Sequence, residues 1–418
     1  SITEENRMEL FRRRAARLQK GELCAVDSIS RSAYGNTLTD VKWGKNKDKL
    51  PLEQTMETVV YTLDSHMPVY YRAFPGNIPD SRSVETILTD IRHAGFPHVI
   101  LITDRGYESL QNLERYILAG QAMIMCVKVR QKMVLEKIRE FGDFGGRPPV
   151  MEIDPKSKLY HKQYDLEYPV TGKGGSTTQS DRLRLNLYFD AIRRGTELTA
   201  LDVNIAMQRA ALQEIKEMGA SLDDDVTIKR NYNYFDIDYN ESDRTIQRFT
   251  LNEEKVTAAR RTSGFFAIMT HKLDMDPITA LDNYGLRDEQ EKYFQQMKSQ
   301  MNINRQRTWS EEGKSGRHFI TFIALIISSY LRNIWKTTPL KDRFTSSLEV
   351  LDEMRSIRCI EHRGKAKFIT PFIGGQIDIC NAFGFKIPEG CEPTYMSKKK
   401  TEKKRGRPRK TKDVIKLD

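Results

Sequence analysis

The sequence is poor in the residues that build zinc sites and disulfide frameworks. It has 5 cysteines in 418 residues, widely spaced, with no Cys-x-x-Cys pair and no histidine pattern typical of zinc. Cys24 and Cys126 lie in apolar, strand-like runs, so we expect buried thiols of a reducing compartment. These absences argue against a zinc protein and against a small secreted scaffold.

Long hydrophobic runs are also scarce. The most apolar run, Phe319–Leu331, is short and interrupted by serines, so we expect a buried core helix over residues 318–334 and no membrane partner. An Arg-rich helical pattern over residues 4–20 stands where a signal peptide would lie. The Gly-rich loop 172–178 lacks the Gly-Lys-Ser/Thr ending of a Walker loop, which argues against that kind of nucleotide site.

Excess positive charge is nearly confined to one tail. The net charge is +11, and the segment Lys398–Lys412 holds ten Lys or Arg and one acid, which leaves about +2 for the rest of the chain. For the body, the basic composition is therefore weak evidence of nucleic-acid binding.

The first 130 residues show the order β-β-β-α-β-α-β. The expected strands are Glu22–Ser28, Met56–Leu63, Met67–Phe74, Val99–Asp104 and Ala122–Val129, with helices near 82–94 and 109–118. Asp80 or Ser81 can cap the first of these helices. The first and fourth strands end in Asp27 and Asp104, which predicts two carboxylates at a sheet rim, although each alone is also typical of a turn.

A later helix carries an unusual polar face. Tyr284, Arg287, Glu291 and Lys298 return to one side of a 3.6-residue helix, where a packing face would carry aliphatic side chains. A solvated face with local ion pairs is the alternative.

The three acids together suggest a chemistry. If Glu291 meets Asp27 and Asp104, the site is rich in hard oxygen donors and suits Mg²⁺ or Mn²⁺. A pair of such ions, roughly 4 Å apart, activates an attacking water or hydroxyl and stabilises the leaving oxygen in phosphodiester chemistry. Arg287 and Lys298 can then meet phosphates, and Tyr284 can do so through its hydroxyl.

This pattern resembles the RNase H-like fold of DDE transposases. Tyr284, Arg287, Glu291 and Lys298 match in full the Tyr-Arg-Glu-Lys signature of the large insertion-sequence transposase family. Further similar segments are Asp27–Ser30, Trp43–Asp48, Gly76–Asp80, Asp104–Ser109 with Asn112, and the late Ile369–Pro371 with Gln376 and Phe383–Gly384. The resemblance covers roughly residues 20 to 390.

The resemblance implies a metal-binding catalytic triad of Asp27, Asp104 and Glu291, with two Mg²⁺ or Mn²⁺ ions as cofactors. It implies cut-and-paste transposition, in which the enzyme nicks element ends and transfers strands into target DNA. The implied partners are double-stranded transposon-end and target DNA and a second copy in a synaptic homodimer. The implied location is the bacterial cytoplasm, at the nucleoid. Family members often carry an N-terminal DNA-binding region, whereas about twenty residues precede the first strand here.

The expected fold class is α/β, with an RNase H-like mixed sheet of three antiparallel strands followed by parallel strands. The expected domains are the first part of the catalytic core at 1–130, a β-rich insertion at 131–262, the second part of the core at 263–339, a small α-rich C-terminal region at 340–395, and a basic disordered tail at 396–418.

The tail contains Arg405, Gly406, Arg407 and Pro408, the core of an AT-hook. Glycine lets the backbone lie deep in the minor groove of A·T tracts, proline keeps it extended, and the arginines enter the groove. A generic basic tail on phosphates is the alternative.

Other features leave further readings open. Trp309, Tyr232, Tyr234 and Phe235 could stack on an unpaired base, with core packing as the alternative for the last three, and His318 fits a satisfied core histidine. Two rival functions remain: a catalytically silent DNA-binding protein that acts through its tail, and a two-metal nuclease without strand transfer.

Overall fold

The computed structural model describes residues 2–33, 37–47, 50–142, 149–171, 177–300, 305–361 and 368–391. For residues 171, 177–179 and 289–300 the description extends to the backbone alone. The chain forms two compact units, residues 1–327 and 328–418.

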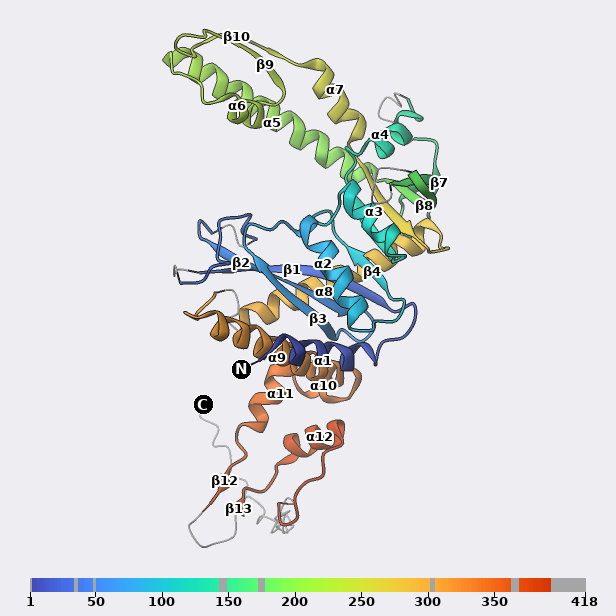
Figure 1. Cartoon of the computed structure of the whole chain (residues 1–418), viewed down its shortest axis with the longest axis vertical. Coiled ribbons are helices and arrows are strands. Elements are labelled where there is room, and N and C mark those ends of the chain that lie inside the picture. The colour runs from blue at the N-terminus through green and yellow to red at the C-terminus, as the bar shows by residue number, and fades with distance from the viewer. Residues whose placement is uncertain are drawn as a thin grey trace, which may run out of the picture. The chain divides into compact units, whose positions relative to one another are not determined.

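A mixed sheet of nine strands organises the first unit (Figure 1). Its strands, in order across the sheet, are β3 (Pro68–Pro75), β2 (Gln54–Thr62), β1 (Leu23–Ser32), β4 (Ile100–Thr103), β5 (Ala122–Val127), β11 (Phe265–His271), β8 (Thr177–Phe189), β7 (Tyr160–Thr171) and β6 (Glu152–Ile153). β1, β2 and β3 are antiparallel, whereas β4 and β5 run parallel to β1. This half of the sheet confirms the predicted RNase H-like fold class.

Strand β1 is longer than predicted. It was expected to end at Asp27 and Ser28, but it continues to Ser32 and pairs with β2 along this whole length. The polar residues Ser30 and Ser32 resemble a turn in the sequence, yet both are buried and their hydroxyls accept hydrogen bonds from Lys47 and Asn46. Polar side chains that find partners inside the fold do not end a strand.

Helices cover both faces of the sheet. Those of the first unit are α1 (Glu4–Ala15), α2 (Asp80–His93), α3 (Leu110–Leu118), α4 (Lys132–Arg139), α5 (Ala191–Met218), α6 (Asp225–Asn231), α7 (Glu253–Thr262), α8 (Pro277–Gln300) and most of α9 (Glu311–Thr337). The start of α8 packs through Leu281 and Tyr284 on a cluster that contains Ala25, Ile102 and Ile124. The helix that carries the predicted polar face therefore lies against β1, β4 and β5.

Helix α9 has one buried side. Phe322 and Leu325 are fully buried in the main core, but Ile320 is 67% exposed and Ile327 is 54% exposed, so the predicted core helix is buried along one stripe only. By length and composition alone α9 could cross a membrane. Its buried stripe accounts for part of that apolar composition through packing inside the protein.

The range predicted as a β-rich insertion contains two different parts. Strands β7 and β8 extend the main sheet beyond β11. A second part is made of α5, α6, the hairpin of β9 (Phe235–Tyr239) and β10 (Ile246–Leu251), and α7, and it surrounds a core of its own that includes Leu201, Leu212 and Val256. The predicted domain boundaries stay a prediction.

The second unit is small. It contains α10 (Leu340–Arg343), α11 (Ser347–Met354), the short pair β12 (Cys359–Ile360) and β13 (Phe368–Ile369), and α12 (Gly374–Phe383). Leu340, Phe344, Val350 and Ile379 form one of its buried clusters.

Candidate active site

Asp27 and Asp104 are brought together by the register of two parallel strands. Cys24 pairs with Leu101 and Ala25 with Ile102, so the same offset places Asp27 opposite Asp104. β4 ends at Thr103, whereas β1 continues beside β2. Asp27 therefore lies inside a strand whose neighbour has just ended, and its side chain remains 15% exposed.

The loop after Asp104 is shaped around that carboxylate. The Gly106 N–H donates to Asp104 Oδ1 over 2.8 Å. A Cβ at Gly106 would lie 2.9 Å from Asp104 Oδ1 and 3.0 Å from Asp80 Oδ2. A side chain at this position would push against both carboxylates, and the oxygens of Asp80 and Asp104 flank the same point.

Asp80 is a site residue that the sequence reasoning missed. It was expected, with Ser81, as a helix cap, but Pro79 is the N-cap of α2 and no side chain caps this end. Asp80 instead accepts a hydrogen bond from the Ser28 hydroxyl. The signal that could have found it is the Gly76–Asp80 segment, which already matched the family.

Asn112 joins the two elements that carry Asp80 and Asp104. Its Nδ2 donates to the Ser81 carbonyl over 2.7 Å and to the Tyr107 carbonyl over 2.6 Å. Asn112 is fully buried, so these bonds are costly to lose. One side chain thus fixes the start of α2 relative to the loop after β4.

Lys47 lies among these carboxylates. Its Nζ is 3.4 Å from Asp27 Oδ1 and 3.7 Å from Asp80 Oδ2, and it donates to the Ser28 carbonyl over 2.8 Å. Burial opposes the ammonium charge, but Asp27, Asp80 and Asp104 outweigh this and raise the pKa of Lys47. We name the group formed by Asp27, Asp80, Asp104 and Lys47 the acid centre.

Helix α8 adds an arginine to the acid centre. Arg287 Nη1 lies 3.7 Å from Asp104 Oδ2, and the guanidinium carbon lies 5.2 Å from the centre of the Tyr284 ring. Burial and the Cys126 thiol raise the pKa of Tyr284. The Tyr284 ring thus supports Arg287, and the predicted contact of its hydroxyl with phosphate stays a prediction.

Glu291 and Lys298 lie on α8, but their side chains are outside the described residues. The helix is continuous from Arg287 past Lys298, so the backbone carries Glu291 about 6 Å along the axis from Arg287. Arg405, Gly406, Arg407 and Pro408 also lie outside the described residues.

The acid centre suits a hard cation. Its donors are carboxylate oxygens, which Mg²⁺ and Mn²⁺ prefer, and the ammonium of Lys47 marks a place where positive charge is stabilised. Among the side chains that are described, no three acidic, histidine or cysteine groups could hold one ion as they stand. Asp27 and Asp104 would supply two of the ligands, and the third predicted ligand, Glu291, has its side chain outside the described residues.

A second charged cluster on β1 is closed. Arg31 and Glu57 form an ion pair with both side chains fully buried, and His318 Nδ1 lies 2.5 Å from Glu57. Burial opposes the Glu57 charge, but Arg31 and His318 outweigh it and lower the pKa of Glu57. His318 is a buried core histidine, as predicted, and its Nδ1 is paired with Glu57, whereas its Nε2 has no hydrogen-bond partner among the described residues.

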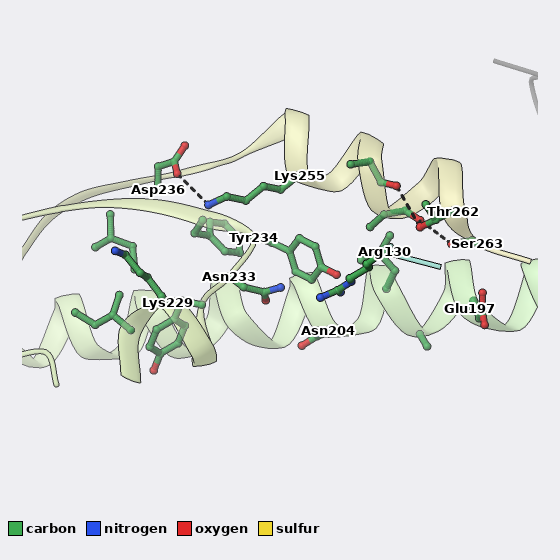
Figure 2. A pocket seen from close by; sticks show the side chains of 18 of the residues that line it. Arg130, Glu197, Asn204, Lys229, Asn233, Tyr234, Asp236, Lys255, Thr262 and Ser263 are labelled. Carbon is green, nitrogen blue, oxygen red and sulfur yellow. Dashed lines mark hydrogen bonds and ion pairs between the residues drawn. The ribbon is translucent and has the colours of Figure 1, made fainter. Parts of the chain in front are cut away.

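A hollow in the described part of the chain lies away from the acid centre. It measures about 1190 Å³ and lies among α5, α6, α7 and the β9 hairpin. Figure 2 shows Arg130, Asn233 and Tyr234 grouped between the helices of Asn204 and Lys255. None of the acid-centre residues lines this hollow. Tyr232 and Tyr234 line the hollow and pack against the core that includes Leu201 and Leu212, as the core-packing alternative predicted.

Comparison with known proteins identifies the family of the chain. The family model described as "Transposase DDE domain" matches residues 18–327. A solved chain of a piggyBac transposase synaptic complex with hairpin DNA is similar at 9% identity and a TM-score of 0.40, over 76% of this chain and 48% of that chain. This chain thus spans about half the length of that solved chain, and no curated protein matches. Because the family model covers more than half of the sequence, including Asp27, Asp104 and Glu291, the chain belongs to the transposase DDE domain family.

Proposed function

We propose that this protein is a DNA transposase of the insertion-sequence family with the Tyr-Arg-Glu-Lys signature, which cleaves element ends and transfers them into target DNA. The observation that carries this proposal is the register that sets Asp27 beside Asp104, with α8 packed against the same strands. Helix α8 also carries Glu291, which in this proposal joins the same two carboxylates.

The side chains take distinct roles in this proposal. Asp27, Asp104 and Glu291 bind the divalent ions, which supply an activated water or hydroxyl and stabilise the leaving oxygen. Asp80 adds a fourth carboxylate through its contact with Ser28. Arg287 holds Asp104 and can present its planar fork to a phosphate, while Lys298 meets a phosphate further along the DNA.

The partners follow from the proposed chemistry. The substrates are transposon-end and target double-stranded DNA, and two copies of the chain act together as a synaptic homodimer. We place the protein in the bacterial cytoplasm at the nucleoid, where its DNA substrates are. The AT-hook-like tail adds affinity for A·T tracts through Arg405 and Arg407.

The first test replaces Glu291. We expect Glu291→Ala to retain DNA binding and to lose Mg²⁺-dependent cleavage of element-end DNA, because a metal ligand is removed. Asp288→Ala is a matched control, since Asp288 is an exposed acid one turn earlier on the same helix. Cleavage by the Glu291 variant at the wild-type rate would show that Glu291 is not a ligand.

The second test separates the rival functions. A transposase gives a joined product when cleaved ends are incubated with target DNA and Mg²⁺. A plain two-metal nuclease gives cleavage without joining, and a catalytically silent DNA-binding protein gives neither.

The third test removes the tail. Truncation after Tyr395 deletes the basic run, so we expect weaker DNA binding and a flatter dependence of affinity on salt concentration. An unchanged salt slope would remove the tail from the account of DNA binding.

A further inference from the structure

The loop that carries Lys47 is fixed by close backbone contacts. The N–H and carbonyl groups of Lys42 and Gln54 bond to each other in both directions over 3.0 Å. A Cβ at Gly44 would lie 2.0 Å from the Gly76 carbonyl oxygen, so only glycine fits there. The described part of one family-like segment, residues 43–47, therefore packs directly against the other, Gly76–Asp80.

The end of the loop is attached to β1. Ser30 Oγ accepts the Lys47 backbone N–H over 3.0 Å, and Ser32 Oγ accepts from Asn46 Nδ2 over 2.9 Å. Both serines are buried, so water competes little for these bonds. The backbone of Lys47 is thus held beside the strand of Asp27, and only its four-carbon side chain is free to reorient.

In the acid centre, the carboxylates outnumber the positive charges. Lys47 and Arg287 supply two positive charges to the three carboxylates of Asp27, Asp80 and Asp104. Carboxylates this close repel one another without a cation between them. The Lys47 side chain is 30% exposed, so it has a path out of the acid centre.

We propose that Lys47 is a resident counter-ion that keeps the acid centre assembled in the metal-free protein, and that a divalent ion binds by displacing its ammonium group. The inference rests on the proposed function, because it takes the acid centre to be the divalent-ion site. It makes Lys47 a positioning residue that sets the affinity for metal, and it gives the Trp43–Asp48 segment a role that the catalytic triad does not explain.

Calorimetric titration of the full chain with Mn²⁺ in the absence of DNA tests the inference. Lys47→Met keeps most of the aliphatic side chain and removes the charge. We expect it to bind Mn²⁺ about tenfold more tightly, because the ion no longer has to displace an ammonium group from the carboxylates of Asp27 and Asp80. Its thermal midpoint in EDTA should fall below that of wild type. Lys45→Met, an exposed lysine of the same loop, and Lys47→Arg should both stay near wild type.

Chemical labelling tests the same point without a variant. We expect acetylation of Lys47 in the wild-type chain, followed by mass spectrometry, to rise severalfold when Mn²⁺ is added, while labelling of Lys45 stays constant. Unchanged Lys47 labelling, or equal or weaker Mn²⁺ binding by Lys47→Met, would overturn the inference.

Mn²⁺ binding by wild type and by Asp27→Asn distinguishes failure of the Lys47 inference from failure of the proposed function. If wild type binds Mn²⁺ and Asp27→Asn does not, the proposed function survives and the Lys47 inference is judged on its own. If wild type binds no Mn²⁺, both proposals fall.

Discussion

Strand β1 carries two charged clusters that are built in opposite ways. The acid centre around Asp27 is partly open to solvent and has more carboxylates than cations. The cluster of Arg31, Glu57 and His318 is closed, with the Arg31 and Glu57 side chains fully buried and paired. The two begin four residues apart on the same strand, and strand alternation places Asp27 and Arg31 on the same face.

The difference separates a binding site from a structural ion pair. A buried charge is tolerated when an opposite charge pairs with it. The Arg31 and Glu57 side chains are paired and shut off from solvent, so a ligand has no path to them. A cluster with excess negative charge at a sheet rim is stable only with a further cation. Local charge balance and access to solvent, rather than the presence of charged residues, therefore distinguish the two clusters on β1.

The largest expected effect is on catalysis. Asp104→Asn should lower Mg²⁺-dependent cleavage by about 10³-fold or more, because it weakens an ion ligand at the reacting phosphate. The thermal midpoint should stay the same or rise, since repulsion within the acid centre is reduced. A large loss of stability with cleavage retained would show that Asp104 is a structural residue. The acid centre and the closed cluster would then not differ in role.

Replacements in the closed cluster of Arg31, Glu57 and His318 should lower the stability of the fold, whereas those in the acid centre should lower cleavage. Glu57→Ala leaves Arg31 buried without its carboxylate, so the free energy of unfolding should fall by about 3–5 kcal/mol in urea titrations. The double variant Arg31→Met with Glu57→Leu should lose less, because both charges are removed together. Equal losses for the single and double variants would contradict pairing as the source of stability.

Acid should act on the closed cluster through Glu57. The pKa of Glu57 is lowered in the folded protein, so its contribution to stability is complete above the unfolded value of about 4.3 and is lost as the pH falls through the folded value. Thermal midpoints measured from pH 6 to pH 3 should fall more steeply for wild type than for Glu57→Gln. Parallel curves would assign acid sensitivity to other groups.

The smallest expected effect concerns Ser28. Its hydroxyl donates to Asp80, so Ser28→Ala should reduce cleavage by about 3- to 10-fold, the usual scale for one hydrogen bond to a charged group. Ser81→Ala, next to Asp80 on α2, is the matched control. No change in cleavage would place Asp80 outside the working site.

Much of the first half of the fold could be predicted from the sequence. The order of strands and helices up to β5 followed from apolar runs and from the turns between them. The strand before Asp104 was expected over Val99–Asp104 and spans Ile100–Thr103, one residue shorter at each end. Ser109 caps the following helix. Strands β7 and β8 were missed, although Leu183, Leu185 and Leu187 alternate as in a half-buried strand.

The rest of the site depends on contacts between distant segments. Asp80 is placed by Ser28, and Lys47 is placed by Ser30 and by the approach of Gly44 to Gly76. No local pattern encodes such pairs, because each partner alone is consistent with a cap or a solvated loop. The polar end of β1 was missed for the same reason, since its serines find their partners in the Lys47 loop.

The central claim is that Asp27, Asp104 and Glu291 bind divalent ions together. Replacement of Mg²⁺ by Fe²⁺, followed by ascorbate and peroxide, produces hydroxyl radicals at the ion and cuts the nearby backbone. The account predicts cuts near Asp27, Asp104 and Glu291 that excess Mg²⁺ suppresses. Cuts confined to other segments, or no cuts that Mg²⁺ suppresses, would contradict it.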